Sequence, residues 1–259
     1  MTAESPSLDE VIRIARAAGE EVLEVYARGC VVQRKVDGSP LTEADVRSQE
    51  VISTRLARLA PGVPIVAEEG DSPAPGEPRS SAFWLVDPLD GTKEFVSRNG
   101  EFTVNIALIE EEAPVLGVVL APALGRLFAA ATGNALVEDA AGRRSLSART
   151  TPAEGATVVS SRSHGDADAL ARFEACRRIA ASITAGSSLK FCLLAAGEAD
   201  LYPRFGRTME WDTAAGDAVL RAAGGLVTDL DGHPLRYGKP GFENPHFVAR
   251  GSEAASPAG

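Results

Sequence analysis

Hydrophobic positions near the start of the chain recur at helical spacing. Over residues 7–27 apolar side chains return every three or four positions, which predicts an amphipathic helix. A second helix is predicted over residues 42–60, where Thr42 is a suitable N-cap. A short strand is predicted over residues 63–66. The Pro-, Ser- and Gly-rich residues 71–82 predict a mobile surface loop.

Short apolar runs dominate the middle of the chain, and the pattern then changes. Strands predicted at 103–109, 115–120, 126–131 and 135–138 follow one another closely, which indicates an antiparallel meander. Beyond residues 149–155, short strands alternate with helices, an order typical of an α/β layer. The predicted strands are 158–161, 183–185, 201–202 and 226–228, and the predicted helices are 165–178, 187–197 and 212–223. We therefore expect an α/β protein with two stacked parts, residues 1–150 and 151–259, and a cleft between them.

Composition narrows the classes of function. The net charge of −10 over 259 residues argues against binding a nucleic-acid polymer, which needs a basic stripe. A small phosphorylated substrate stays compatible, because bound metal ions supply positive charge locally. Cys30, Cys176 and Cys192 lack CxxC spacing and are expected to be reduced, mostly buried thiols. With neither a signal-peptide pattern nor an apolar stretch of about 20 residues, a soluble intracellular protein is expected.

Two carboxylates follow the strand-like run at residues 83–86. Asp87 and Asp90 are three positions apart, with Gly and Thr directly after them. Acids at the carboxyl end of a strand face the crevice in which α/β proteins place their sites. Together with the Leu89 carbonyl, these oxygens match a hard cation such as Mg²⁺. The alternative is a polar turn, since Asp-Gly is common in turns.

Three further acids occupy similar positions. Glu68 follows the strand predicted at 63–66, Asp45 lies three residues after Thr42, and Asp212 begins a helix rich in small residues. Asp45 has an equally good local explanation as the acid of a capping box, and Asp212 as an N-cap. Convergence of the acids on one cleft favours a multi-metal carboxylate site over a set of unrelated caps.

Several other motifs are absent or incomplete. The chain contains neither a G-x-x-x-x-G-K-[ST] phosphate loop nor a G-x-G-x-x-G dinucleotide turn. Residues 229–232 imitate a calcium loop, but Pro234 and Pro240 stand where Gly and Glu are required, so a hairpin turn is predicted. Pro88 occupies the position of the nucleophilic aspartate of haloacid-dehalogenase phosphatases, which excludes their covalent mechanism.

The acidic motifs around Glu68, Asp87 and Asp212 together resemble those of the inositol monophosphatase superfamily of Mg²⁺-dependent, lithium-sensitive phosphatases. The resemblance covers roughly residues 8–250 and rests on Glu68-Glu69, on 87–92 and on 211–216. It implies a layered αβαβα sandwich with the site between the layers. The closest likeness is to the bacterial 3′(2′),5′-bisphosphate nucleotidases of sulfur assimilation, through residues 35–45, 90–95, 99–105 and 187–191.

The resemblance also implies roles at matching positions. Two or three Mg²⁺ ions would be held by Glu68, Asp87, the Leu89 carbonyl, Asp90 and Asp212. Thr92 would orient and deprotonate the attacking water with either Asp45 or Glu68, a choice that the sequence leaves open. The amides of Gly91 and Thr92 would bind the phosphoryl group if a helix starts there.

Substrate choice depends on residues of the second half. Inositol phosphatases carry an acid where this chain has Arg204, and a guanidinium suits a second phosphate. Ser187 and Lys190, expected on one helical face, resemble nucleotidase residues near that phosphate, and His164 is expected near the adenine. The alternative for Lys190 and Arg204 is solvated surface charge.

The expected activity is therefore Mg²⁺-dependent hydrolysis of the 3′-phosphate of adenosine 3′,5′-bisphosphate to AMP and phosphate, linked to sulfate assimilation. The first alternative is a broader phosphatase acting on inositol 1-phosphate or fructose 1,6-bisphosphate. A non-catalytic nucleotide sensor is disfavoured because Asp87, Asp90, Thr92 and Asp212 are all present. A cytoplasmic protein is expected, either free or peripheral on the inner face of the membrane, and as a monomer or a homodimer.

Overall fold

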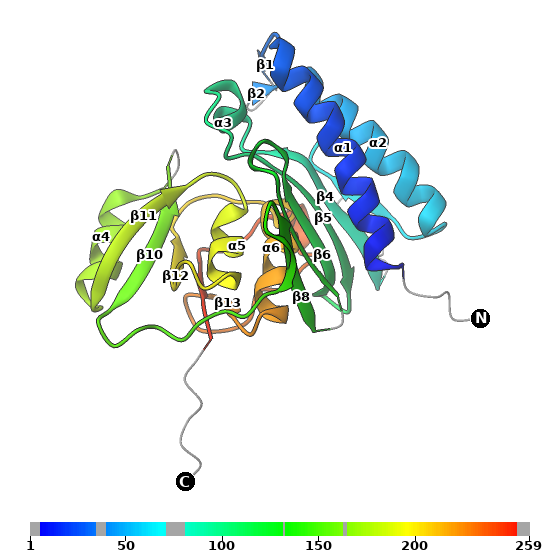
Figure 1. Ribbon diagram of the computed structural model, residues 1–259. Helices are drawn as coiled ribbons and strands as arrows, with labels where there is room; N and C mark the ends of the chain where they lie inside the picture. The colour runs from blue at the N-terminus through cyan, green and yellow to red at the C-terminus, as the bar shows by residue number, and fades with distance from the viewer. Residues whose placement is uncertain (1–5, 35–39, 71–80, 132, 163–164, 253–259) are drawn as a thin grey trace.

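The fold consists of five layers, in the order helix, sheet, helix, sheet, helix (Figure 1). A computed structural model describes residues 6–34, 40–70, 81–131, 133–162 and 165–252. The outer helices α1 (Leu8–Arg28) and α2 (Glu43–Leu59) lie side by side on one face of the larger sheet. Helices α5 (Leu189–Ala195) and α6 (Glu210–Ala222) lie between the sheets, and α4 (Ala167–Ala175) lies outside the smaller sheet. This arrangement confirms the expected αβαβα sandwich.

Within the described ranges, the larger sheet has seven strands in the order β3-β4-β5-β6-β7-β8-β9. They span Ile65–Ala67, Ala82–Asp90, Thr103–Glu110, Ala113–Ala121, Arg126–Ala131, Asn134–Asp139 and Gly142–Ser145. Only the β3–β4 pair is parallel, so the predicted meander is confirmed from β4 onward. The last strand escaped prediction because every residue in it is exposed, which leaves no apolar alternation to detect.

In the part of the chain that the structure describes, the smaller sheet has five strands in the order β11-β10-β12-β14-β13. They span Ile179–Ala185, Ala156–Ser161, Leu201–Arg204, Phe247–Arg250 and Leu226–Asp229. Strand β10 is parallel to β11 and β12, as the alternation of strands and helices predicts. Strand β14 is antiparallel to both β12 and β13 and was not predicted. The sheet is therefore mixed.

Close packing of α6 joins the two halves. A Cβ added at Gly117 of β6 would lie 2.6 Å from the carbonyl oxygen of Ala215, so the helix backbone approaches the sheet directly. A Cβ added at Gly216 would lie 2.6 Å from Cδ2 of Phe191 in α5. The small residues Ala214, Ala215 and Gly216 of α6 therefore allow close packing of the helix against β6 and α5. Whether the two halves also behave as separate domains stays a prediction.

The remaining elements are short. They are β1 (Gln33–Arg34), β2 (Pro40–Leu41), α3 (Thr92–Val96) and two 3₁₀ turns, η1 (Pro122–Leu124) and η2 (Pro240–Phe242). The loop predicted at 71–82 falls mainly on residues 71–80, outside the described ranges. All three cysteines are free thiols, but Cys176 is exposed and Cys30 half-buried, so the expectation that they are mostly buried was wrong.

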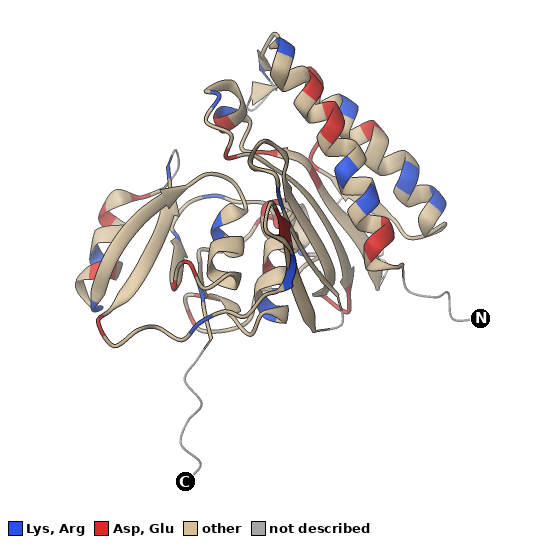
Figure 2. Ribbon diagram, viewed as in Figure 1, with Lys and Arg blue, Asp and Glu red and all other residues tan. Residues whose placement is uncertain are grey.

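The outer helical layer is charged along its length. Acidic and basic residues alternate over α1 and α2 (Figure 2), and Arg47 of α2 forms a two-bond pair with Glu24 of α1, each bond 2.9 Å long. Among the described residues no helix is long and apolar enough to cross a membrane.

Candidate active site

Strands β3 and β4 deliver two acids to the same edge of the larger sheet. Ala67 pairs with Val86 in parallel register, and the amide of Glu68 donates to the Val86 carbonyl at 3.1 Å. Glu68 directly follows β3, as the sequence predicted, whereas Asp87 lies within β4, which continues to Asp90. The pairing of β4 with β5 is irregular between Asp87 and Asp90, where the Leu89 amide donates to Oδ1 of Asp87 at 3.0 Å.

Helix α6 brings a further acid to this edge. Asp212 is the third residue of the helix, and its Oδ2 accepts a hydrogen bond of 2.8 Å from the amide of Met209. It is thus the acid of a capping box and not the N-cap itself. Burial raises the pKa of Asp212 to about 8, and the charges of Asp90 and Glu68 act in the same direction. The cap and the acidic cluster therefore share one side chain.

Besides burial, electrostatic repulsion between acids of the two halves raises their pKa values. Burial raises the pKa of Asp87 well above its ordinary range, and Glu68, Asp90 and Asp212 add to this effect in that order. Burial likewise raises the pKa of Asp90 to about 6. Lys190 opposes the rise, as does a hydrogen bond that Asp90 accepts from the amide of Ser188. Buried carboxylates that repel one another are stabilised by cations placed between them.

The donor set fits a hard divalent cation. Carboxylates and one backbone carbonyl supply only oxygen, which Mg²⁺ prefers. The four acids do not form a group of three whose ligand atoms all lie within 4.8 Å of one another; among the described residues such a group occurs only at Asp229, Asp231 and His233. Ligands spread in this way suit more than one ion, each held by few protein groups and by water.

Asp45 lies beside this cluster and also caps α2. Its Oδ2 accepts hydrogen bonds from the amide of Thr42 at 2.8 Å and from the Thr42 hydroxyl at 2.6 Å. Burial raises the pKa of Asp45 to about 7, with smaller contributions from the charges of Glu69 and Glu68. The capping interpretation is confirmed, and the influence of the neighbouring acids places Asp45 within electrostatic reach of the site.

Helix α3 begins at Thr92, directly after the two aspartates. Its N-cap, Gly91, has a φ of 87°, a left-handed conformation that favours glycine. The condition for phosphate binding by the amides of Gly91 and Thr92 is therefore met. The Thr92 hydroxyl lies 3.4 Å from the carbonyl oxygen of Leu89. Its partner in activating water, Asp45 or Glu68, stays open.

Two buried cations come from the second half of the chain, Lys190 from α5 and Arg204 from β12. Lys190 is 3% exposed and Arg204 is 8% exposed, so the interpretation of these residues as solvated surface charge is wrong. Nζ of Lys190 donates to the carbonyls of Ser187 at 2.5 Å and Ala185 at 3.3 Å. Burial lowers the pKa of Lys190 to about 8, Asp90 raises it, and Arg204 lowers it further. The two cations and Asp90 therefore lie within mutual electrostatic reach.

Ser187 does not share a helical face with Lys190, because it precedes α5 and has a φ of 47°. The pair meets instead through the Ser187 carbonyl. His164 lies outside the described residues.

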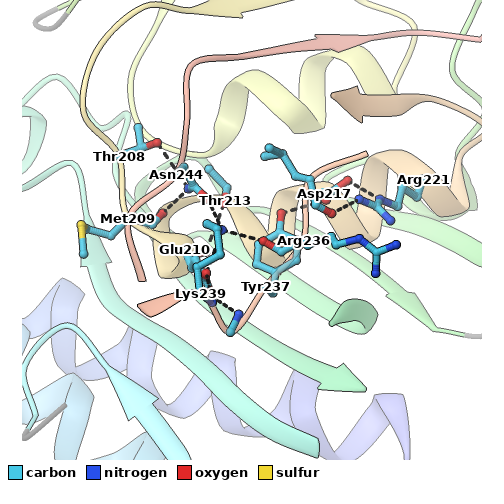
Figure 3. A network of polar contacts seen from close by, with 12 residues as sticks. Thr208, Met209, Glu210, Thr213, Asp217, Arg221, Arg236, Tyr237, Lys239 and Asn244 are labelled. Carbon is cyan, nitrogen blue, oxygen red and sulfur yellow. Dashed lines mark hydrogen bonds and ion pairs between the residues drawn. The ribbon is translucent and has the colours of Figure 1, made fainter. Parts of the chain in front are cut away.

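A polar network around the start of α6 escaped prediction (Figure 3). Glu210 is fully buried and pairs with Nζ of Lys239 at 2.7 Å, and it also accepts from the Lys239 amide at 2.8 Å. Asn244 donates to the Met209 carbonyl at 2.8 Å and to the Thr213 hydroxyl at 3.1 Å. These contacts fix the turn that carries Asp212. The partners are about 30 residues apart along the chain, so no local signal could reveal them.

The turn at residues 229–233 is the predicted hairpin. Oδ1 of Asp229 accepts from the amides of Asp231 at 3.0 Å and His233 at 2.9 Å. These bonds explain the clustering of the three side chains through turn chemistry.

Comparison with known proteins gives a consistent picture. Residues 4–255 match the model of the inositol monophosphatase family. The chain is 47% identical over 245 residues to the 3′(2′),5′-bisphosphate nucleotidase CysQ of Escherichia coli strain K12, covering 93% of this chain and 98% of that one. It is 32% identical to the Haemophilus influenzae protein of the same name, over 95% and 93% of the two chains.

Solved structures agree. The crystal structure of CysQ from Bacteroides thetaiotaomicron, a bacterial member of the inositol monophosphatase family, superposes with a TM-score of 0.82 at 36% identity, over 95% of this chain and 97% of that one. A Thermotoga maritima IMPase superposes with a TM-score of 0.77 at 27% identity, over 94% and 91% of the chains.

Proposed function

The chain belongs to the inositol monophosphatase family, and on this premise we propose that it hydrolyses the 3′-phosphate of adenosine 3′,5′-bisphosphate to AMP and phosphate. The relatives named 3′(2′),5′-bisphosphate nucleotidase support this activity at 47% identity over most of the chain. Removal of this by-product of sulfate activation links the activity to sulfate assimilation.

The observation that carries the choice of substrate is the buried pair Lys190 and Arg204. A bisphosphate brings one phosphate to the acidic cluster and a second that needs compensating charge. Two cations that are 3% and 8% exposed supply this charge where water screens it little. Inositol 1-phosphate has no second phosphate to occupy them.

The family is metal-dependent, typically on Mg²⁺. We propose that two or three ions are held by Glu68, Asp87, the Leu89 carbonyl, Asp90 and Asp212. When bound, such ions neutralise the phosphate, lower the pKa of water and stabilise the leaving alkoxide. The positions of these acidic side chains would determine where the positive charge of the ions lies.

The remaining roles fall to groups around the cluster. The Thr92 hydroxyl orients the attacking water, and the amides of Gly91 and Thr92 hold the phosphoryl oxygens. Either Asp45 or Glu68 accepts the proton of the water. The pKa of about 7 at Asp45 favours this residue, because a base is most effective when its pKa lies near the working pH. Ser187 and His164 are proposed to contact the nucleotide.

Phosphate release over a panel of esters tests the proposal. In the presence of Mg²⁺, kcat/KM should be highest for adenosine 3′,5′-bisphosphate, at least tenfold above that for inositol 1-phosphate. Fructose 1,6-bisphosphate is the sharper comparison, because it also carries two phosphates and would satisfy both cations. If kcat/KM on either sugar ester is equal or higher, the nucleotidase assignment is wrong and the protein is a broader phosphatase. If no phosphate is released from any ester, a nucleotide sensor is favoured.

A cytoplasmic location stays a prediction, and a peripheral membrane location is not proposed further. Monomer and homodimer both stay open.

A further inference from the structure

The turn formed by Gly186, Ser187 and Ser188 connects the smaller sheet to Asp90. It follows β11 and leads into α5. The Ser188 amide donates a hydrogen bond to Asp90, and Lys190, two residues later, attracts the same carboxylate. The position of this turn therefore affects both the hydrogen bond to Asp90 and the charge that Lys190 places near it.

Strand β5 holds the turn through a buried chain of hydrogen bonds. In the β4–β5 ladder, Thr103 is paired with Asp90 and Asn105 with Asp87. The Ser188 hydroxyl donates to Oδ1 of Asn105 at 2.7 Å and lies 2.8 Å from the Thr103 hydroxyl. Because the single proton of Ser188 points to Asn105, Thr103 must be the donor in the second bond. Each of these three residues is at most 2% exposed.

Glu101 fastens the same turn from the other side. Its Oε2 accepts a hydrogen bond of 2.8 Å from the Gly186 amide, and Arg162 pairs with the carboxylate at 3.0 Å. A Cβ at residue 186 would lie 2.5 Å from the Glu101 carbonyl oxygen, so the two segments are in backbone contact. The turn is thus held by hydrogen bonds at both Gly186 and Ser188.

We propose that Thr103, Asn105 and Ser188, here called the Asp90 clamp, are positioning residues for metal binding. Because Thr103 is the cross-strand partner of Asp90 and shares a hydrogen bond with Ser188, the clamp sets the position of the Ser188 turn relative to the Asp90 carboxylate. Its members reach the reacting atoms only through Asp90. This inference rests on the proposed function, because it assigns Asp90 as a Mg²⁺ ligand. Hydrogen-bonding partners of metal ligands commonly tune metal affinity.

Two substitutions at Thr103 separate a positioning role from a packing role. Thr103→Val keeps the shape and removes the hydroxyl, whereas Thr103→Ser keeps the hydroxyl and removes a methyl group. Metal-stripped protein is titrated with Mg²⁺ alone, without substrate, and its melting temperature reports the apparent Kd. A neutral hydrogen bond is worth about 0.5–1.5 kcal/mol, so Thr103→Val should bind Mg²⁺ about two- to tenfold more weakly. Thr103→Ser should stay within about twofold of the wild type.

A matched control and a second variant complete the experiment. Tyr237→Phe removes a buried hydroxyl that lies outside the clamp and donates to Asp217 at 2.8 Å (Figure 3). It should lower the melting temperature and leave the Kd for Mg²⁺ unchanged. Ser188→Ala keeps the backbone amide that donates to Asp90 and removes both hydrogen bonds of the Ser188 hydroxyl. It should weaken Mg²⁺ binding at least as much as Thr103→Val.

The clamp is refuted if Thr103→Val and Ser188→Ala bind Mg²⁺ as tightly as the wild type. It is also refuted if Thr103→Ser is weakened as much as Thr103→Val, because packing then explains both. Phosphate release from the bisphosphate by the wild type is measured in parallel. A wild type that binds Mg²⁺ without hydrolysing the nucleotide contradicts the proposed function alone, and the Mg²⁺ titrations still decide on the clamp.

Discussion

Replacement of Asp90 by asparagine is expected to make the metal-free protein more stable while it abolishes turnover. Burial raises the pKa of Asp90 from 3.8 to about 6, with contributions from the charges of Glu68 and Glu94. At about 1.4 kcal/mol for each pKa unit, the ionised carboxylate costs the folded state up to about 3 kcal/mol. Asparagine removes this charge and keeps an oxygen that can accept the hydrogen bond from the Ser188 amide.

The pH dependence follows from the direction of the shift. Between about pH 4 and pH 6 the folded protein retains a proton at Asp90 that the unfolded chain has already released, so the stability of the wild type falls as the pH rises. Above about pH 6 both states are ionised and the full cost is present. The gain from Asp90→Asn should therefore be largest at pH 7.5 and smaller at pH 5, measured by urea unfolding with a chelator present.

A control substitution and the addition of Mg²⁺ test this electrostatic explanation. Asp139 pairs with Arg144 at 2.8 Å, and this hydrogen bond lowers the pKa of Asp139 to about 2, so Asp139→Asn should destabilise the protein at pH 7.5. Addition of Mg²⁺ should stabilise the wild type more than Asp90→Asn, because binding to the folded state adds to stability. A variant that is less stable than the wild type at pH 7.5, or equally stabilised at both pH values, would contradict the electrostatic account.

Three further outcomes are expected. Arg204→Ala should lower kcat/KM for adenosine 3′,5′-bisphosphate by about ten- to a hundredfold, the value of a lost charge-assisted contact, and change kcat/KM for inositol 1-phosphate little; equal losses on both esters would assign Arg204 to the fold. Turnover should fall in millimolar lithium, on the order of the Mg²⁺ present, since both hard cations compete for the same oxygens; undiminished rates would count against the metal assignment. Gly216→Val should overlap Phe191 and lower stability by about 1–3 kcal/mol in thermal unfolding, and an unchanged melting temperature would mean that α5 moves aside freely.

Acids at strand ends could be predicted because their signal is local. The apolar run of β4 is interrupted at Asp87, and β3 ends just before Glu68, so the sequence itself marks both acids, although β4 continues to Asp90. The burial of Lys190 had no such mark. A lysine in a short helix indicates surface exposure, and only the position of α5 between two sheets places it inside.

Other features depend on partners far along the chain. Strand β14 has four residues and exists because it pairs with β12 and β13 on either side. Helix capping and membership of the acidic cluster are also not exclusive alternatives for an aspartate. Asp45 and Asp212 each use one oxygen to cap a helix, and a carboxylate has further lone pairs to offer the cluster.

The position of α6 between the two sheets also has a consequence for biosynthesis. Glu68 and Asp87 leave the ribosome long before Asp212, and the acidic cluster gains its last member only when α6 has packed against both halves. On the proposed assignment of these acids as Mg²⁺ ligands, a nascent chain therefore lacks part of its ligand set until the fold is complete. Cellular Mg²⁺ would then act on this protein as a late ligand that favours the finished chain over truncated or partly assembled forms.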